Sequence, residues 1–186
     1  MEYINLNKTI NAISYFSKNV KYFGKTKLYK LLYFLDFTHF KETGRSVTGY
    51  NYFAWDFGPV PKTLFEKLDC AEEELPEEFK KIINITRLNK FNEIKTKAPA
   101  NMNVFSKREI RILKELSDIF KYVRAKDIKR ISHLKGDPWD QTIETKGEYQ
   151  QIDYLLSLDD SSESISKEEA KEKQVRFYET IKLISG

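Results

Sequence analysis

The sequence predicts a mainly α protein: a compact helical domain around a central apolar helix at about residues 26–43, with a small antiparallel β element. Three observations lead to this fold class. One long segment is apolar on nearly every side, which is typical of a buried central helix. Most other segments repeat apolar residues at helical spacing, and two short adjacent segments match a hairpin. Together these patterns favour helices packed with a small antiparallel sheet.

The first two helices are expected at residues 7–20 and 27–43. Thr26 is a candidate cap for the second helix, and Gly44 stands where a helix end often needs a positive φ. In the first segment the apolar spacing is carried by Ile10, Ile13, Phe16 and Val20. The stripe of the second consists of Leu28, Leu31, Leu32, Leu35 and His39, widened by Phe34, Phe37 and Phe40.

The next segments are shorter. Residues 47–57 are rich in aromatic and β-branched residues and are expected to be partly extended. Pro61 is expected to open a short helix through Leu68, because the missing N–H of proline costs nothing at a first helical position. Pro76 similarly precedes a short helix at 77–82. Residues 83–88 and 91–96 then flank Asn89–Lys90 and predict a hairpin.

The last third again favours helices. Ser106 and Glu109 form a capping box before a helix at 107–120, and a second short helix is expected at 125–134. Residues 152–158 fit helix or strand equally. A terminal helix at 167–184 offers Val175, Tyr178, Ile181 and Leu183 or Ile184 for docking. We therefore expect one domain at 1–158, followed by an acidic linker and helix at 159–186 that packs on it or extends it.

Charge is unevenly spread along the chain. Residues 1–135 have 26 Lys and Arg against 16 Asp and Glu, a net +10, whereas residues 136–186 have 6 against 12, a net −6. Such a basic region suits nucleic acid or an acidic partner. The basic and aromatic segment 121–130 is one place where phosphates would bind. The interspersed spacing of the charges nevertheless favours solvated helix faces.

The residues that usually carry chemistry are few. The single cysteine, Cys70, excludes an internal disulfide and favours a reducing cytoplasm. Asp36 and His39, three residues apart on one helix, are the one candidate metal pair, but His39 lies on the apolar stripe and fits a core histidine better. No phosphate-binding loop or nucleophile motif occurs. We expect no catalytic residue, no metal and no cofactor, and also no membrane span.

Aromatic residues cluster in one segment held by glycine and proline. Rigid aromatic side chains bury a large area at little entropic cost, as in protein-recognition surfaces. The alternative is that they fill the core beside the central helix, and we expect alternation to send some inward and some outward. The candidate partner-binding residues are Tyr50, Tyr52, Trp55, Phe57 and Pro59.

Two blocks of residues resemble the SocA-like antitoxin family, also called the Panacea domain. The resemblance extends over about residues 28–158. The first block consists of residues 27–37, His39, residues 43–49, Ala54-Trp55 and Gly58-Pro59-Val60. The second consists of Phe105-Ser106, Glu109, Leu113, Ser132-His133 and Trp139.

The resemblance implies a cytoplasmic antitoxin that neutralises a co-encoded protein toxin by direct binding. It also implies, for at least one branch, delivery of the toxin to an ATP-dependent protease. The motif residues Asp36, His39, Gly58, His133 and Trp139 match, with roles that the match leaves open. We expect His133 and Trp139 to pack near the central helix.

Two alternatives to the antitoxin hypothesis follow from the residues. The first is a regulatory protein that binds nucleic acid through the basic region. The second is an enzyme that uses Asp36, His39 and His133.

Overall fold

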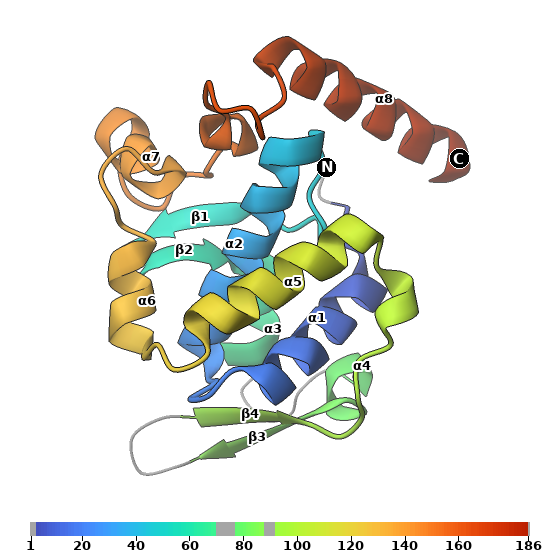
Figure 1. Cartoon of the computed structure of the whole chain (residues 1–186), viewed down its shortest axis with the longest axis vertical. Helices are drawn as coiled ribbons and strands as arrows, with labels where there is room; N and C mark the ends of the chain where they lie inside the picture. The colour runs from blue at the N-terminus through green and yellow to red at the C-terminus, as the bar shows by residue number, and fades with distance from the viewer. Residues whose placement is uncertain (1–2, 70–76, 88–91, 186) are drawn as a thin grey trace.

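The computed structural model describes residues 3–69, 77–87 and 92–185. The predicted hairpin turn Asn89–Lys90, Cys70 and most of the acidic segment before Glu77 lie outside these ranges. Within them the chain forms eight α-helices and two small antiparallel sheets, which confirms the predicted fold class, mainly α with a small β element (Figure 1). The helices are α1 (Leu6–Asn19), α2 (Lys25–Thr43), α3 (Lys62–Asp69), α4 (Glu77–Lys80), α5 (Lys107–Phe120), α6 (Ala125–Ile131), α7 (Pro138–Lys146) and α8 (Lys167–Ser185).

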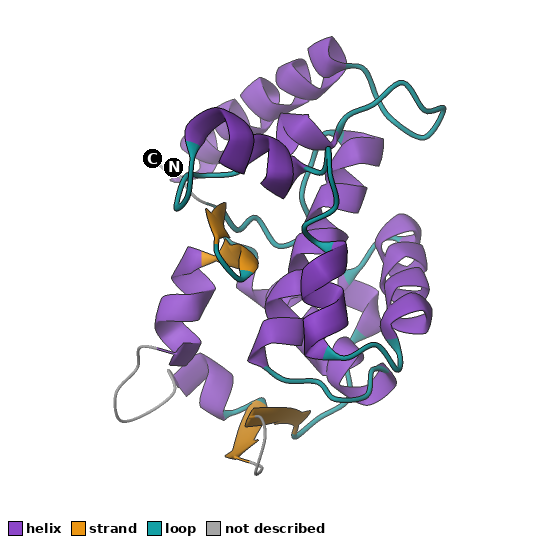
Figure 2. Cartoon of the chain, turned by 90° about the vertical axis from the view of Figure 1, so that its left-hand side faces the viewer, coloured by secondary structure: helices purple, strands orange, loops and turns teal. Residues whose placement is uncertain are grey.

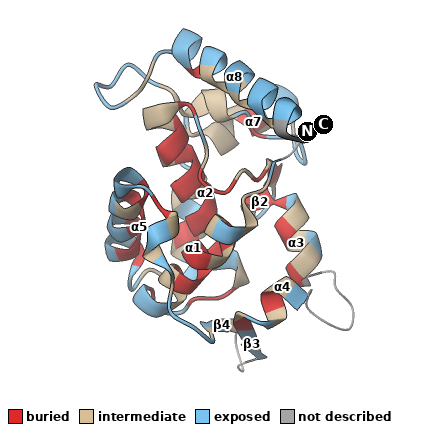
Figure 3. Ribbon diagram, turned by 90° about the vertical axis from the view of Figure 1, so that its right-hand side faces the viewer, coloured by how far each residue is buried: buried red, intermediate tan, exposed pale blue. Residues whose placement is uncertain are grey.

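Helix α2 is the centre of the fold, which confirms the predicted central helix. It runs through the middle of the molecule and is buried along most of its length (Figure 3). It ends at Gly44, whose φ of 73° is left-handed and whose N–H donates to the Phe40 carbonyl. Its start differs slightly from the expectation, because Gly24 and not Thr26 occupies the N-cap position.

Helices α1 and α5 pack together against α2. Both halves of the predicted capping box form, since the Ser106 side chain accepts from Glu109 N and the Glu109 carboxylate accepts from Ser106 N. Phe34 of α2 stacks on Phe120 of α5 with ring centroids 5.2 Å apart. The core is centred on these three helices, and residues of α3, α4, α6 and the two hairpins complete it.

The two sheets are separate β hairpins that lie apart in the molecule (Figure 2). Strands β3 (Ile83–Arg87) and β4 (Asn92–Thr96) form the hairpin that the sequence predicts. Strands β1 (Tyr52–Trp55) and β2 (Gly58–Pro61) form a second, which we did not predict. Pro61 therefore ends a strand, and α3 begins one residue later at Lys62.

The C-terminal part differs most from expectation. Helix α7 was not predicted, and the ambiguous segment 152–158 contains a short 3-10 helix, η2 (Tyr154–Ser157). Helix α8 forms as expected; of its proposed docking residues Ile181 is half-buried, whereas Val175, Tyr178 and Leu183 are exposed. Its contacts with the body instead involve Ala170, which is buried, and Phe177, which packs on Tyr3 with centroids 5.5 Å apart.

Within the described ranges, no helix combines the length and the apolar character needed to cross a bilayer.

Candidate functional site

The turn between β1 and β2 is held by Trp139 of α7, which itself stacks on His133, just after α6. The indole N–H of Trp139 donates to the Trp55 carbonyl at 3.0 Å. The His133 ring stacks on Trp139 with centroids 3.8 Å apart and planes 12° from parallel. Two motif residues that are distant from the turn in sequence thus fix its position. We call this group the hairpin site: Lys30, Trp55, Phe57, Gly58, His133 and Trp139.

At Gly58 the hairpin closely approaches Lys30 of α2 and His133. The φ of Gly58 is +91°, and a Cβ atom there would lie 2.5 Å from His133 Nε2 and 2.9 Å from Lys30 Cε and Nζ. Heavy atoms do not approach that closely without displacement. Only glycine satisfies both the backbone angle and the space, so the match of Gly58 to the family motif has a structural cause.

Lys30 projects from α2 into this packed region. Its side chain is buried, and its Nζ donates to the Pro59 carbonyl at 2.8 Å. Burial, followed by the nearby charge of Lys129, lowers the pKa of Lys30 to about 7. Burial and the two lysines likewise lower the pKa of His133 to about 4, so its ring is neutral at pH 7. Its buried Nε2 has no hydrogen-bond partner among the described residues.

The depressed pKa of Lys30 predicts a pH-dependent stability. Between pH of about 7 and about 10.5 the unfolded chain holds a proton on Lys30 that the folded chain has released, so stability rises with pH across this window. Below about 7 the buried charge is fully present and its destabilising effect is greatest. We expect the free energy of unfolding of the wild type, minus that of Lys30→Met, to increase by several kcal/mol across the window. Urea unfolding at a series of pH values measures it, and a constant difference would contradict the assignment.

Phe57 is the exposed element of the hairpin site. Its side chain is 67% exposed, although Lys129 Nζ lies 4.6 Å from the centre of its ring. Trp55 is half-buried and packs edge-on against Phe65. By contrast Tyr50, Tyr52 and Pro59 are buried. Tyr50 and Tyr52 belong to the core, and Pro59 is buried beside them in sequence, so none of these three predicted residues presents its side chain to a partner.

Asp36 holds a different part of the fold together. Its carboxylate is fully buried on α2, and Oδ1 accepts from Val47 N at 2.8 Å and Thr48 N at 2.7 Å. Its Oδ2 accepts from the Thr48 hydroxyl and from the Tyr52 hydroxyl, the latter at 2.8 Å. Burial raises the pKa of Asp36 to about 6 against these four donors. The residue ties the loop before β1, and β1 itself, to the central helix.

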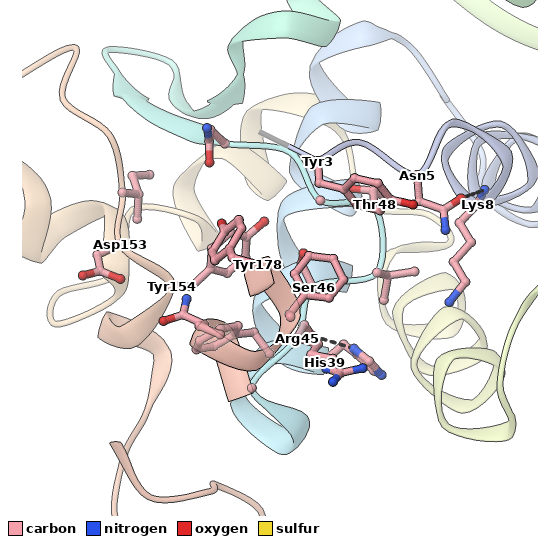
Figure 4. A pocket seen from close by; sticks show the side chains of 18 of the residues that line it. Tyr3, Asn5, Lys8, His39, Arg45, Ser46, Thr48, Asp153, Tyr154 and Tyr178 are labelled. Carbon is pink, nitrogen blue, oxygen red and sulfur yellow. Dashed lines mark hydrogen bonds between the residues drawn. The ribbon is translucent and has the colours of Figure 1, made fainter. Parts of the chain in front are cut away.

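His39 lines a separate hollow of about 640 Å³ beside α8. Its Nδ1 donates to the Arg45 carbonyl at 2.7 Å, and its Nε2 lies 4.0 Å from a Glu109 oxygen that also pairs with Lys8 at 2.6 Å. Burial lowers the pKa of His39. Figure 4 shows the hollow with Tyr3, Asn5 and Lys8 on one side and Asp153 and Tyr154 on the other.

The three residues of the enzyme alternative therefore lie in different environments. Asp36 binds the loop at 47–48, His39 faces Arg45 and Glu109, and His133 stacks on Trp139. In the part of the chain that the structure describes, no cluster of three or more His, Cys, Asp or Glu side chains is arranged to hold a metal ion.

The family model of the SocA-like antitoxins, described as the Panacea domain, matches residues 28–140. This is well over half of the chain. The chain belongs to the SocA-like antitoxin family. Neither the curated proteins nor the solved structures yield a match.

The Panacea domain includes every residue of the hairpin site. It begins within α2, contains both hairpins, α5 and α6, and ends inside α7 just after Trp139. The match is shorter at its C-terminal end than the region to Leu158 that we expected, and η2 and α8 lie outside it. The matched region thus contains α5 and most of α2, while α1, which also belongs to the core, and α8 lie outside it.

Sequence reasoning missed Lys30 as a member of this site. A lysine usually reads as solvent-exposed, yet here it lies between Tyr29 and Leu31 in a helix that is apolar nearly all round. The available signal was a lysine on a helix that has no polar face. Because such a helix is packed on nearly all sides, a charged side chain on it is expected to be buried.

Proposed function

We propose that the protein is an antitoxin that neutralises a co-encoded toxin in the cytoplasm by direct binding, with the hairpin site contacting the toxin. The family assignment supports an antitoxin role. The observation that carries the choice of site is Phe57, a large aromatic side chain held in solvent by a turn that His133, Trp139 and Gly58 make rigid. Exposed aromatic residues on rigid turns lose little entropy on binding and often dominate interfaces.

The experiment uses the protein together with the product of the neighbouring reading frame. Expression of that product alone is expected to arrest growth, and co-expression of this chain is expected to restore it. The two proteins are also expected to co-purify from the rescued cells. Absence of both rescue and co-purification would refute the proposal.

Phe57→Ser separates partner binding from folding. Because the side chain is largely exposed, its removal is expected to change the free energy of unfolding by less than about 0.5 kcal/mol. Affinity for the toxin is expected to fall at least about tenfold, as for an aromatic residue in an interface centre. Calorimetric titration measures the affinity, and Val175→Ser, at a comparably exposed position on α8, provides a comparison away from the turn. Unchanged affinity of Phe57→Ser would remove Phe57 from the interface.

A finer form of the proposal is that the antitoxin also delivers its toxin to an ATP-dependent protease. It predicts that the toxin disappears faster in cells that contain both the antitoxin and the protease than in cells that lack the protease. A toxin half-life that is independent of the protease contradicts delivery but leaves neutralisation intact.

We further propose that the protein is not an enzyme. Turnover of a substrate by the purified chain would refute this proposal.

A further inference from the structure

Exposed basic and aromatic side chains gather around α6. Tyr22 and Tyr122 are 46% and 68% exposed, and Phe57 lies at the neighbouring hairpin turn. Within residues 121–135 there are six basic residues and one acidic residue, Asp127. We call this surface the basic face: Tyr22, Phe57, Lys121, Tyr122, Arg124, Lys126, Lys129, Arg130 and Lys135.

Contacts between distant segments make the basic face continuous. Lys21 N donates to the Lys121 carbonyl at 2.8 Å, which joins the α1–α2 turn to the α5–α6 turn. The Arg124 guanidinium lies 5.1 Å from the centre of the Tyr22 ring. At the other end Lys129 lies over Phe57, and Figure 1 shows α6 directly beneath the β1–β2 turn.

The positive charge of this surface is poorly balanced. Asp127 lies 3.8 Å from Arg130, a weak pair on a side chain that is 81% exposed. The charge of Lys129 also reaches the buried groups, since it contributes to the lowered pKa of both Lys30 and His133. A surface with this excess attracts an acidic partner and accelerates its association.

We propose that the basic face receives an acidic surface of the co-encoded toxin, an inference that rests on the proposed antitoxin function. An aromatic centre with arginine and lysine around it has the composition of a protein–protein interface. Nucleic acid fits less well, because each of the three exposed rings already has a cation within 6 Å where a base would stack. Helix α6 also has only seven residues, which is short for a helix that reads a groove.

The test reverses three charges on the face and three elsewhere. The face variant is Lys121→Glu, Arg124→Glu and Lys126→Glu, all exposed. Arg124 and Lys126 lie at the start of α6, where acidic side chains suit the helix dipole, and Lys121 is the C-cap of α5. The control variant is Lys107→Glu, Lys114→Glu and Lys171→Glu, which are exposed on α5 and α8. Both variants change the net charge equally. Circular dichroism and thermal unfolding verify that each is folded.

Affinity for the product of the neighbouring reading frame is measured by calorimetry at about 50 and about 300 mM NaCl, where screening differs strongly. We expect wild-type affinity to fall about tenfold between the two salt concentrations. The face variant is expected to bind at least about thirtyfold more weakly at low salt and to lose most of the salt dependence, whereas the control variant stays within about threefold of the wild type.

Each other outcome overturns a different statement. If the wild type binds and the face variant binds equally well, the basic face is not the interface, while the antitoxin function stands. If the wild type does not bind the toxin at all, the proposed function fails and the inference fails with it.

Gel-shift titration with a DNA duplex and a single-stranded RNA tests the alternative that the basic face binds nucleic acid. Loss of nucleic-acid binding in a face variant that still binds the toxin would assign the surface to nucleic acid.

Discussion

Replacing Asp36 with alanine is expected to lower the free energy of unfolding by more than about 3 kcal/mol, because it leaves several buried donors unpaired. The carboxylate accepts from two backbone N–H groups, at Val47 and Thr48, and from two hydroxyl groups, at Thr48 and Tyr52. Water cannot easily replace it, since Asp36, Thr48 and Tyr52 are all fully buried. The loop before β1 is therefore expected to detach from α2.

Asp36→Asn is the matched control. Its amide oxygen accepts from the two backbone N–H groups, and its NH₂ group donates to the two hydroxyl oxygens, so the shape and most of the hydrogen bonds survive. We expect a loss well below that of the alanine variant. Guanidinium unfolding followed by circular dichroism measures both variants. A loss below about 1 kcal/mol for Asp36→Ala would show that the network adds little to stability.

The parts of the fold that were predicted correctly are those in which local and tertiary preferences agree. The segment at 27–43 is apolar on nearly all sides and ends at a glycine, so its pattern, its stop signal and its central position all favour one helix. The capping box at Ser106 and Glu109 and the hairpin of β3 and β4 are equally local. Each signal lies within a few residues of the structure that it specifies.

The β1–β2 hairpin was missed because its sequence contradicts the usual signals of a strand. Strand β2 contains Gly58, Pro59 and Pro61, and prolines lower the expectation of a strand since they cannot donate to a ladder. The pairing works because the sheet has only two strands and Gly58 accepts a φ that other residues avoid. Helix α7 did carry a local signal, Pro138 at its first turn after Asp137.

The candidate site was only partly predictable from the sequence, because its residues come together through contacts between distant segments. Sequence reasoning found Trp55, Phe57, Gly58, His133 and Trp139 separately, but their contacts join segments about 80 residues apart. Whether an aromatic residue faces the core or the solvent depends on that packing. Alternation in β1 buries Tyr52 and Ala54 and leaves Phe53 and Trp55 half-buried, so one segment serves both the core and the surface.

Gly58→Ala is the second substitution that is expected to lower the free energy of unfolding strongly, and Gly147→Ala provides the comparison. Both glycines have a positive φ, +91° and +89°, which L side chains rarely adopt, so alanine at either position incurs backbone strain of about 1–3 kcal/mol. At Gly147 nothing lies within 4 Å of the new Cβ, whereas at Gly58 it meets His133 Nε2 at 2.5 Å. We therefore expect Gly58→Ala to destabilise by more than about 3 kcal/mol, and by at least about 1 kcal/mol more than Gly147→Ala, which incurs the backbone strain alone.

The steric cause can be isolated with a double-mutant cycle. Because the His133 ring is fixed by stacking on Trp139, it cannot move aside, whereas the Lys30 ammonium ends a flexible chain. His133→Ala removes the obstruction, so Gly58→Ala is expected to cost at least about 1 kcal/mol less in that background than in the wild type. If the two losses simply add, the contact with His133 is not the cause. If the cycle shows coupling and Gly58→Ala also weakens toxin binding at temperatures where the variant is folded, then the packing beneath the turn sets the orientation in which Phe57 meets its partner.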